Sequence, residues 1–388
     1  MWIPAADAPR RPRADRLFRD YTSVLPPRIA GCTPRLGGQT QVSVGAATAA
    51  VAQVDTTAEF NLAAISGVLL RSEAVASSKI EHIRTNQAEL VAVLAGAAGS
   101  RAARDVAANV GVVTRLVAEA DSGVITEAML LRAHRDLLGD DPFEGRYAGA
   151  YRPVQNWIGG SDYSPRDAVH VPPDHKHLPF LMKDLLEFAN RTDLPPIVQA
   201  AVAHAQFEVI HPFTDGNGRV GRGLIHAILR ARGLTSRAVV PIAMALLVDL
   251  DGYFSAISAY GNEGEVDRFV QLFADAAVRA SVESIATIEE LAALPDRWRG
   301  LVRPSRNSVL DRVCGLLIEH PSITTADAMV LTGATRPSAQ AAIDRLEAAD
   351  VLGESTGQRR NRRWTATEVL DAVDDLEDRL GRRTAPRR

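Results

Sequence analysis

One short polar segment of the sequence combines a proton acceptor with a cation ligand. Residues 211–222 read His-Pro-Phe-Thr-Asp-Gly-Asn-Gly-Arg-Val-Gly-Arg. His211 is the side chain of this segment that can accept a proton near neutral pH. Asp215 offers a hard carboxylate oxygen of the kind that Mg²⁺ prefers. The two side chains therefore predict acid–base chemistry beside a bound cation.

The same segment can also hold phosphate groups. Gly216 and Gly218 let the backbone approach an anion closely, and Asn217 tolerates the left-handed conformation that such a loop needs. Arg219 and Arg222 are spaced so that both lie on one face of a helix. A phosphate cradle, a cation ligand and a general base in one segment indicate nucleotidyl or phosphoryl transfer.

Two predicted helices must position these side chains. The apolar stretch 195–210 predicts the first, directly before the segment. The second is expected from about Arg219 to Arg232, with Gly233 as its stop. Its free N–H groups and its dipole favour an anion at the N-terminus. The pattern Gly-x-Gly-x-x-Gly also matches a dinucleotide-binding fingerprint, but that motif needs a preceding β-strand, and the preceding stretch here is helical.

The fold class is predicted to be mainly α, with more than one domain. The chain has 388 residues, which exceeds what one hydrophobic core usually supports. An N-terminal region is expected over residues 1–105, irregular or extended at first and helical from about residue 46. A helical core is expected over residues 106–285 and a C-terminal domain over residues 304–388.

A non-helical segment interrupts the predicted core. Residues 149–173 read GAYRPVQNWIGGSDYSPRDAVHVPP, a stretch rich in glycine, proline, aromatic and β-branched residues. Such a composition favours a β-hairpin or a long loop over a helix.

The C-terminal region, residues 304–388, shows the pattern of a winged helix-turn-helix domain. Three predicted helices precede a basic strip over 352–367, expected as a two-stranded wing, and a closing helix near 367–380. The third helix, about 337–352, would be the one to enter the major groove of DNA. Acidic residues on that helix would repel DNA, so protein contact or dimerisation is the alternative. The candidate phosphate contacts are Arg336, Arg345, Arg359, Arg360, Arg362 and Arg363.

Composition limits the partners and the compartment. The formal net charge of -3 gives no general attraction to nucleic acid or to membranes. Cys32 and Cys314 lie far apart and form no Cys-x-x-Cys pair, which argues against a disulfide framework or a thiolate zinc site. The sequence shows no secretion signal and no apolar run long enough to span a bilayer. A cytoplasmic protein without a membrane partner is expected.

Three parts of the sequence resemble the Fic family. Residues 211–222 match the family signature, HPFx(D/E)GNGRxxR, at every signature position. Residues 149–173 are similar to the family's flap, a hairpin that holds a target segment extended by strand pairing. Residues 77–82, SSKIEH, resemble its inhibitory helix motif, (S/T)xxxE(G/N). The resemblance covers about residues 50–275 and implies an all-helical core with a β-hairpin flap that binds ATP and Mg²⁺.

The resemblance implies a protein adenylyltransferase, which moves AMP from ATP to a Ser, Thr or Tyr hydroxyl of a target protein. His211 would deprotonate the hydroxyl and Asp215 would hold the metal. The residues implied to bind ATP and its phosphates are Gly216, Asn217, Gly218, Arg219 and Arg222. The flap residues implied to contact the target backbone are Ile158, Gly159 and Gly160.

The resemblance also assigns an inhibitory role to Glu81, which would pair with Arg222. A charge-assisted bond of this type is worth about 1.5–3 kcal/mol and would occupy an arginine that the γ-phosphate needs. The residue after Glu81 is His82, where the family has Gly or Asn. The alternatives on this scaffold are removal of AMP, transfer of another nucleotidyl or phosphate-bearing group, and a nucleotide-sensing DNA-binding regulator. A homodimer and DNA binding through residues 304–388 are further hypotheses about partners.

Three side chains outside the signature have competing explanations. His204 lies on a helical face similar to that of His211, so a zinc pair is conceivable, but a buried polar contact is favoured. Tyr253 and Phe254 either border the adenine pocket, as in relatives of the Fic family, or pack in the core.

Overall fold

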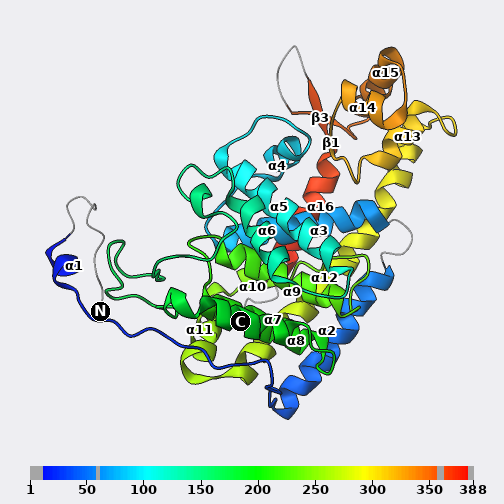
Figure 1. Cartoon of the computed structure of the whole chain (residues 1–388). Coiled ribbons are helices and arrows are strands. Elements are labelled where there is room, and N and C mark those ends of the chain that lie inside the picture. Colours follow the sequence, from blue (N-terminus) through cyan, green and yellow to red (C-terminus); the bar gives the residue numbers. More distant parts are fainter. Residues whose placement is uncertain (1–11, 58–61, 356–361, 383–388) are drawn as a thin grey trace. The chain divides into compact units, whose positions relative to one another are not determined.

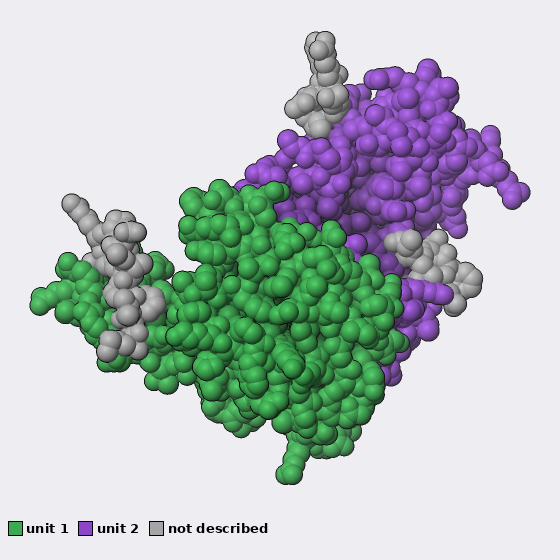
Figure 2. All heavy atoms as spheres, viewed as in Figure 1, with its two compact units in different colours: residues 1–45, 115–233, 250–274 green, residues 46–114, 234–249, 275–388 purple. Residues whose placement is uncertain are grey.

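The computed structural model of the chain describes residues 12–57, 62–355 and 362–382 (Figure 1). These residues form helices and one small three-stranded sheet, which confirms the mainly α prediction. They divide into two compact units, drawn in green and purple in Figure 2. Unit 1 holds residues 1–45, 115–233 and 250–274, and unit 2 holds residues 46–114, 234–249 and 275–388. Within the described residues, no helix is both long enough and apolar enough to cross a membrane.

Unit 1 is built around the helix that precedes the polar segment. This helix, α8 (Pro196–Ile210), has no separate polar face, and nearly all of its side chains are buried, including Gln199, His204 and Gln206. It packs against α7 (Leu178–Ala189), α9 (Asn217–Ala231) and α11 (Leu250–Glu263), and α6 (Glu127–Leu138) packs against α7 and α9. The other elements of this unit are α1 (Arg13–Leu17), η2 (Gly145–Tyr147) and η3 (His175–His177). Three helices belong partly to each unit: α2 (Gly38–Thr57), α5 (Arg101–Ala120) and α12 (Val266–Val302).

Unit 2 contains a helical layer that a buried glutamate helps to hold together. Here α3 (Leu62–Ile80) packs on α10 (Ile242–Leu247), and α10 packs on α16 (Thr367–Arg382) (Figure 1). The buried Glu73 of α3 accepts a hydrogen bond from the N–H of Ala243 in the first turn of α10, at 2.8 Å. A carboxylate at a helix N-terminus satisfies an otherwise unpaired N–H group and interacts favourably with the helix dipole.

The C-terminal part of unit 2 contains the predicted three helices, two-stranded wing and closing helix in that order, with one additional strand, β1. The strands form one antiparallel sheet in the order β1-β3-β2, with Ile323 and Glu354 both paired to Trp364. Strand β1 was not predicted, because its three residues carry no recognisable strand pattern, and the identity of the module stays a prediction. The elements are α13 (Val309–Leu316), β1 (Ser322–Thr324), α14 (Thr325–Thr332), α15 (Arg336–Glu347), β2 (Gly353–Glu354) and β3 (Arg363–Thr365).

Of the arginines predicted to contact DNA phosphates, one is wrongly placed for that role. Arg363 is only 7% exposed, and its guanidinium donates a hydrogen bond to the carbonyl of Ser322 inside the sheet. Arg362 forms ion pairs with Glu347 and Glu354. Arg345 donates to the carbonyl of Val302, and Arg336 is exposed. Arg359 and Arg360 lie outside the described residues.

The two compact units cut across the three consecutive domains that the sequence suggested. Residues 46–114 belong to the same unit as residues 275–388. Lys79 of α3 pairs with Glu377 of α16 at 2.6 Å, and α4 (Gln87–Leu94) packs against β1. Side-chain pairing between distant segments carries no periodic signal, so composition shifts along the chain do not reveal it.

The C-terminal end of α3 adopts a Schellman motif. The N–H of Ile83 donates to the carbonyl of Ser78, and the N–H of His82 donates to that of Lys79, both at 3.0 Å. Glu81 is the exposed C-cap residue of this motif, and His82 has a φ of 61°. His82 therefore adopts the left-handed conformation that glycine or asparagine favours.

We expect His82→Gly to raise the free energy of unfolding by about 0.5–1 kcal/mol. Glycine removes the left-handed strain of a side chain, and its larger unfolded-state entropy offsets part of that gain. The control is His177→Gly, because His177 has a φ of -86° and glycine should only destabilise there. Urea denaturation of the two variants checks the prediction, and equal changes in both would contradict it.

Candidate active site

The imidazole of His211 is oriented by the helix that precedes it. His211 ends α8 in the left-handed conformation, with φ 49° and ψ 62°, and its N–H donates to the carbonyl of Phe207 at 2.9 Å. Its ring Nδ1 lies 3.3 Å from the carbonyl oxygen of Glu208. Because a carbonyl oxygen only accepts, Nδ1 carries the proton and Nε2 keeps its lone pair. The half-buried ring is thus prepared to act as a base through Nε2.

The loop between α8 and α9 is held by the side chain of Asn217. This asparagine is 2% exposed, accepts from the N–H of Phe213 at 2.8 Å and donates to the Phe213 carbonyl at 2.9 Å. Asn156, from the non-helical segment, donates to the same carbonyl at 2.9 Å. The sequence assigned Asn217 to a phosphate, whereas the contacts of its side chain in this structure shape the loop.

A buried histidine fixes the other end of the loop. His134 of α6 accepts from the N–H of Gly149 through Nδ1 at 3.0 Å, and its Nε2 donates to the carbonyl of Asp215 at 3.2 Å. Its ring stacks on Phe213, with centroids 3.8 Å apart and planes 8° apart. Burial lowers the pKa of His134 to about 4, so the ring is neutral at physiological pH.

A buried arginine lies at the start of the same loop. Arg152 is 2% exposed, and its Nε donates to the carbonyl of His211 at 2.9 Å. Its main-chain N–H donates to the carbonyl of Pro212, also at 2.9 Å. Every hydrogen bond of its guanidinium that the structure shows goes to a backbone carbonyl, which is the pattern of a group that fixes the backbone.

Glycines of the signature are required by conformation and by close packing. Gly216 has a φ of 75°, and a Cβ there would lie 2.8 Å from the side chain of Leu137. A Cβ at Gly221 would lie 2.8 Å from the Glu208 carboxylate and 2.9 Å from the Phe207 ring. The first glycine allows the turn into α9, and the second allows α9 to approach α8.

The N-terminus of α9 gathers the groups that could bind a polyphosphate. Arg219 and Arg222 are both buried, at 4% and 1% exposure, and Arg219 pairs with Asp215 at 3.3 Å. Gly218 lies buried in the same first turn, where backbone N–H groups are available to an anion. The predicted helix is present but begins at Asn217, two residues before the expected start. The dinucleotide fingerprint is excluded, because a helix and not a strand precedes the loop.

A single carboxylate of the loop fits a cation that is shared with phosphates. The side chain of Asp215 is 55% exposed, so its oxygens can be reached from solvent. In the described part of the chain, no group of three or more His, Cys, Asp or Glu side chains could hold a metal ion. Mg²⁺ commonly binds through one or two carboxylates and takes its remaining ligands from phosphates and water, and Asp215 fits this mode.

His204 makes the buried polar contact that the sequence favoured. Its Nε2 lies 2.8 Å from the hydroxyl of Tyr253, and both side chains are buried. Burial first, and then the charge of Arg222, lower the pKa of His204 to about 3. Tyr253 therefore packs in the core, stacked at 6.0 Å on the His204 ring.

The segment 149–173 is non-helical and closes on itself, as predicted. The N–H of Ile158 donates to the carbonyl of His170, and the N–H of Val169 donates to that of Ile158, each at 2.8 Å. The turn uses Gly159 and Gly160, with φ of 71° and 73°. Ile158 is 40% exposed and Val169 is 69% exposed, so two apolar side chains of this flap face solvent.

The predicted inhibitory residue, Glu81, and its predicted partner, Arg222, belong to different units. Glu81 caps α3 in unit 2, and Arg222 lies in α9 of unit 1. Their pairing stays a prediction.

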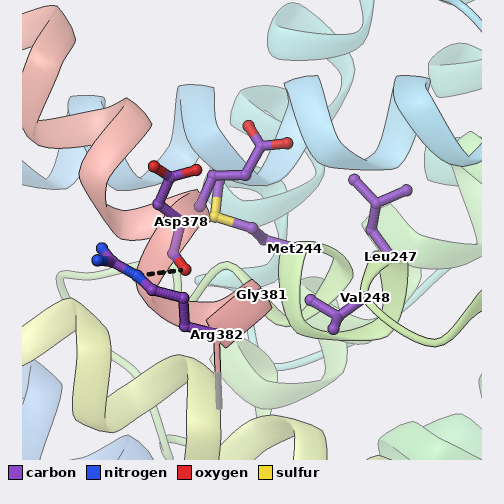
Figure 3. A pocket seen from close by; sticks show the side chains of 7 residues that line it. Met244, Leu247, Val248, Asp378, Gly381 and Arg382 are labelled. Carbon is purple, nitrogen blue, oxygen red and sulfur yellow. Dashed lines mark hydrogen bonds between the residues drawn. The ribbon is translucent and has the colours of Figure 1, made fainter. Parts of the chain in front are cut away.

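A separate hollow lies in unit 2. Figure 3 shows it between α10 and the end of α16, with Met244, Leu247, Val248, Asp378 and Arg382 around it. These residues come from no part of the signature or the flap, so the hollow is distinct from the site described above.

A match to a known family covers the segment that contains this site. Residues 124–229 match the family described as "Fic/DOC family". This segment of the chain is similar to the Fic domain. The matched range holds α6, the flap, α8 and α9, which are the elements that surround His211.

Curated relatives are similar to the chain over the same region. The chain is 34% identical over 155 residues to the protein adenylyltransferase Fic of Drosophila grimshawi and 33% identical over 159 residues to that of Aedes aegypti. These alignments cover 39% and 40% of the chain but only 28% of either relative.

Two solved structures share the fold. A Fic family protein from Desulfovibrio desulfuricans G20 has a TM-score of 0.55 at 21% identity, over 86% of this chain and 97% of that one. Fic-1 from C. elegans has a TM-score of 0.50 at 20% identity, over 64% of this chain and 73% of that one.

Three side chains that hold the loop between α8 and α9 could not be predicted from the sequence. Arg152 and Asn156 lie within the stretch that resembles the flap, but nothing in their spacing indicated contact with the signature. His134 lies in a helix remote from the signature in sequence. An apolar helix face interrupted by a single histidine was the only local signal.

We expect the stability to fall as the pH decreases from about 6.5 to about 4. In this window the unfolded chain binds a proton at His134 that the folded chain does not, so the folded state loses about 3 kcal/mol from this residue. The lowered pKa of the buried His204 likewise reduces the stability of the folded state as the pH decreases. Urea denaturation across the window should show the loss, with a smaller loss in His134→Gln and an unchanged one in His177→Gln, an exposed histidine. A His134→Gln profile parallel to that of the parent would contradict this account.

Proposed function

We propose that the protein transfers AMP from ATP to a Ser, Thr or Tyr hydroxyl of a target protein. The observation that carries this proposal is the loop that presents Nε2 of His211 beside the N-terminus of α9. Relatives named protein adenylyltransferase Fic align over the same region, although the chain spans only about 28% of their length.

The chemistry follows from the groups around the loop. Nε2 of His211 accepts the hydroxyl proton as the hydroxyl oxygen attacks the α-phosphorus in line. The bond between the α-phosphorus and the bridging oxygen breaks, and pyrophosphate leaves with the electron pair. Positioning and charge stabilisation supply most of the rate in such transfers, which agrees with a rigid loop that carries one base.

The phosphates would bind along the start of α9. Gly216, Gly218 and the loop N–H groups would approach the α-phosphate, and Arg219 and Arg222 would contact the β- and γ-phosphates. Asp215 would hold Mg²⁺, which neutralises phosphate charge when bound. Arg219 would have to share its contact with Asp215 in that state, since the two side chains pair in this structure.

The flap would hold the target. Ile158, Gly159 and Gly160 lie at its exposed turn, and a target segment could pair with the backbone there as an added strand. Side chains such as the 69% exposed Val169 would then supply apolar contact.

Glu81 would inhibit the enzyme through Arg222. The Schellman end of α3 supports this role, since it leaves the Glu81 carboxylate exposed at a fixed helix terminus. An ion pair with Arg222 would compete with the γ-phosphate and misalign the α-phosphate. The same carboxylate could orient a water that removes AMP, so deAMPylation is the alternative reaction on this scaffold.

The C-terminal domain would bind a partner. Its element order supports the winged-helix hypothesis. Arg362 and Arg363 are engaged within the domain, however, and Arg345 donates to the carbonyl of Val302 at the end of α12. Contact with protein, including a second copy of this chain, is therefore favoured over DNA for residues 304–388.

Glu81→Gly should raise AMP transfer from labelled ATP by 5- to 150-fold. This range corresponds to the loss of about 1–3 kcal/mol of inhibitory interaction. Glu263→Gly is the matched control, because Glu263 is also an exposed glutamate at the end of a helix. Self-labelling or labelling of lysate proteins measures the effect, and equal activity in the two variants would refute the inhibitory role.

His211→Ala, made in the Glu81→Gly background, should abolish transfer while ATP binding changes less than about twofold. The substitution removes the base but none of the proposed phosphate ligands. His177→Ala, at an exposed position outside the loop, should retain full activity. Transfer that persists in His211→Ala at more than a few per cent would exclude His211 as the base.

A further inference from the structure

We propose that Arg152 is a positioning residue that couples the flap to the catalytic base. The inference rests on the proposed function, because it concerns how His211 is kept ready for transfer.

The guanidinium of Arg152 joins three separate stretches of backbone. Nε donates to the carbonyl of His211 at 2.9 Å, Nη1 to that of Val154 at 2.9 Å, and Nη2 to that of Pro173 at 2.6 Å. Val154 lies where the chain enters the flap, and Pro173 lies where it leaves. One planar group thus fixes both arms of the flap and the residue that carries the base.

Because Arg152 is buried, its guanidinium donors must be hydrogen-bonded within the protein. Arg152 is 2% exposed, and a charge removed from water is costly unless its donors are hydrogen-bonded. Burial lowers the pKa of Arg152 to about 10, partly offset by Asp174 and Tyr21, so the group stays charged at neutral pH. The carbonyls of both flap arms must therefore stay in place for the buried charge to remain satisfied.

The contact with His211 acts on a strained residue. A non-glycine residue in the left-handed region is held there at a cost in free energy. The hydrogen bond from Arg152 to the His211 carbonyl favours this conformation, and the conformation sets the direction of the imidazole. A target strand that orders the flap would consequently also hold the His211 imidazole in its orientation.

Lysine cannot replace Arg152 in this role. Its single ammonium lacks the planar fork that reaches three carbonyls in fixed directions. Arg191 provides a matched control, because it also donates to backbone carbonyls, those of Ala30 and Cys32. Arg191 lies outside both the flap and the loop between α8 and α9.

The experiment compares Arg152→Lys and Arg191→Lys in the Glu81→Gly background. We expect kcat to fall about 10- to 100-fold in Arg152→Lys, as for a misplaced catalytic group, while the KM for ATP changes less than about twofold. Arg191→Lys should keep the parent kcat. Added guanidinium should restore part of the activity of Arg152→Ala and none of the activity of His211→Ala.

Hydrogen exchange provides a readout that does not depend on activity. The amides of Ile158, Val169 and His211 should exchange faster together in Arg152→Lys and stay at the parent rate in Arg191→Lys. If the parent itself transfers no AMP, the proposed function fails, and these exchange rates still decide the coupling. Parent-like exchange or a parent-like kcat in folded Arg152→Lys would overturn the inference. If that variant does not fold, Arg152→Gln is measured by the same criteria.

Discussion

The backbone carbonyls of the loop between α8 and α9 are the constraint on which the site depends. The carbonyls of His211, Phe213 and Asp215 each accept a hydrogen bond from a side chain. The donors are Arg152, Asn156, Asn217 and His134. With its carbonyls fixed, the loop keeps one backbone conformation, as a preorganised phosphate site requires.

The two units of the chain contain the elements for different proposed roles. Unit 1 contains the loop, the flap and α9, which are the elements that the proposed transfer uses. Unit 2 contains α3 with Glu81 and the C-terminal domain, which are the elements that the proposed inhibition and partner binding use.

The local structure of the site could be predicted from the sequence, but the side-chain contacts that hold the loop could not. The helix, loop and helix around His211 could be predicted because the glycines and the apolar stretches leave local signals. The contacts of Arg152 and His134 could not, because they join residues far apart in the chain through hydrogen bonds that leave no periodic pattern. The same limit applies to strand β1 and to the pairing of Lys79 with Glu377. The left-handed His82 likewise depends on backbone hydrogen bonds that residue type alone did not indicate.

The most direct test of the account is the tautomer of His211. Nitrogen chemical shifts of the protein labelled with ¹⁵N-histidine, measured above the pKa of the ring, distinguish a protonated Nδ1 from a protonated Nε2. The account predicts that Nδ1 carries the proton, bound to the carbonyl of Glu208, and that Nε2 is unprotonated. A ring protonated mainly at Nε2 would leave no lone pair facing the substrate and would contradict it.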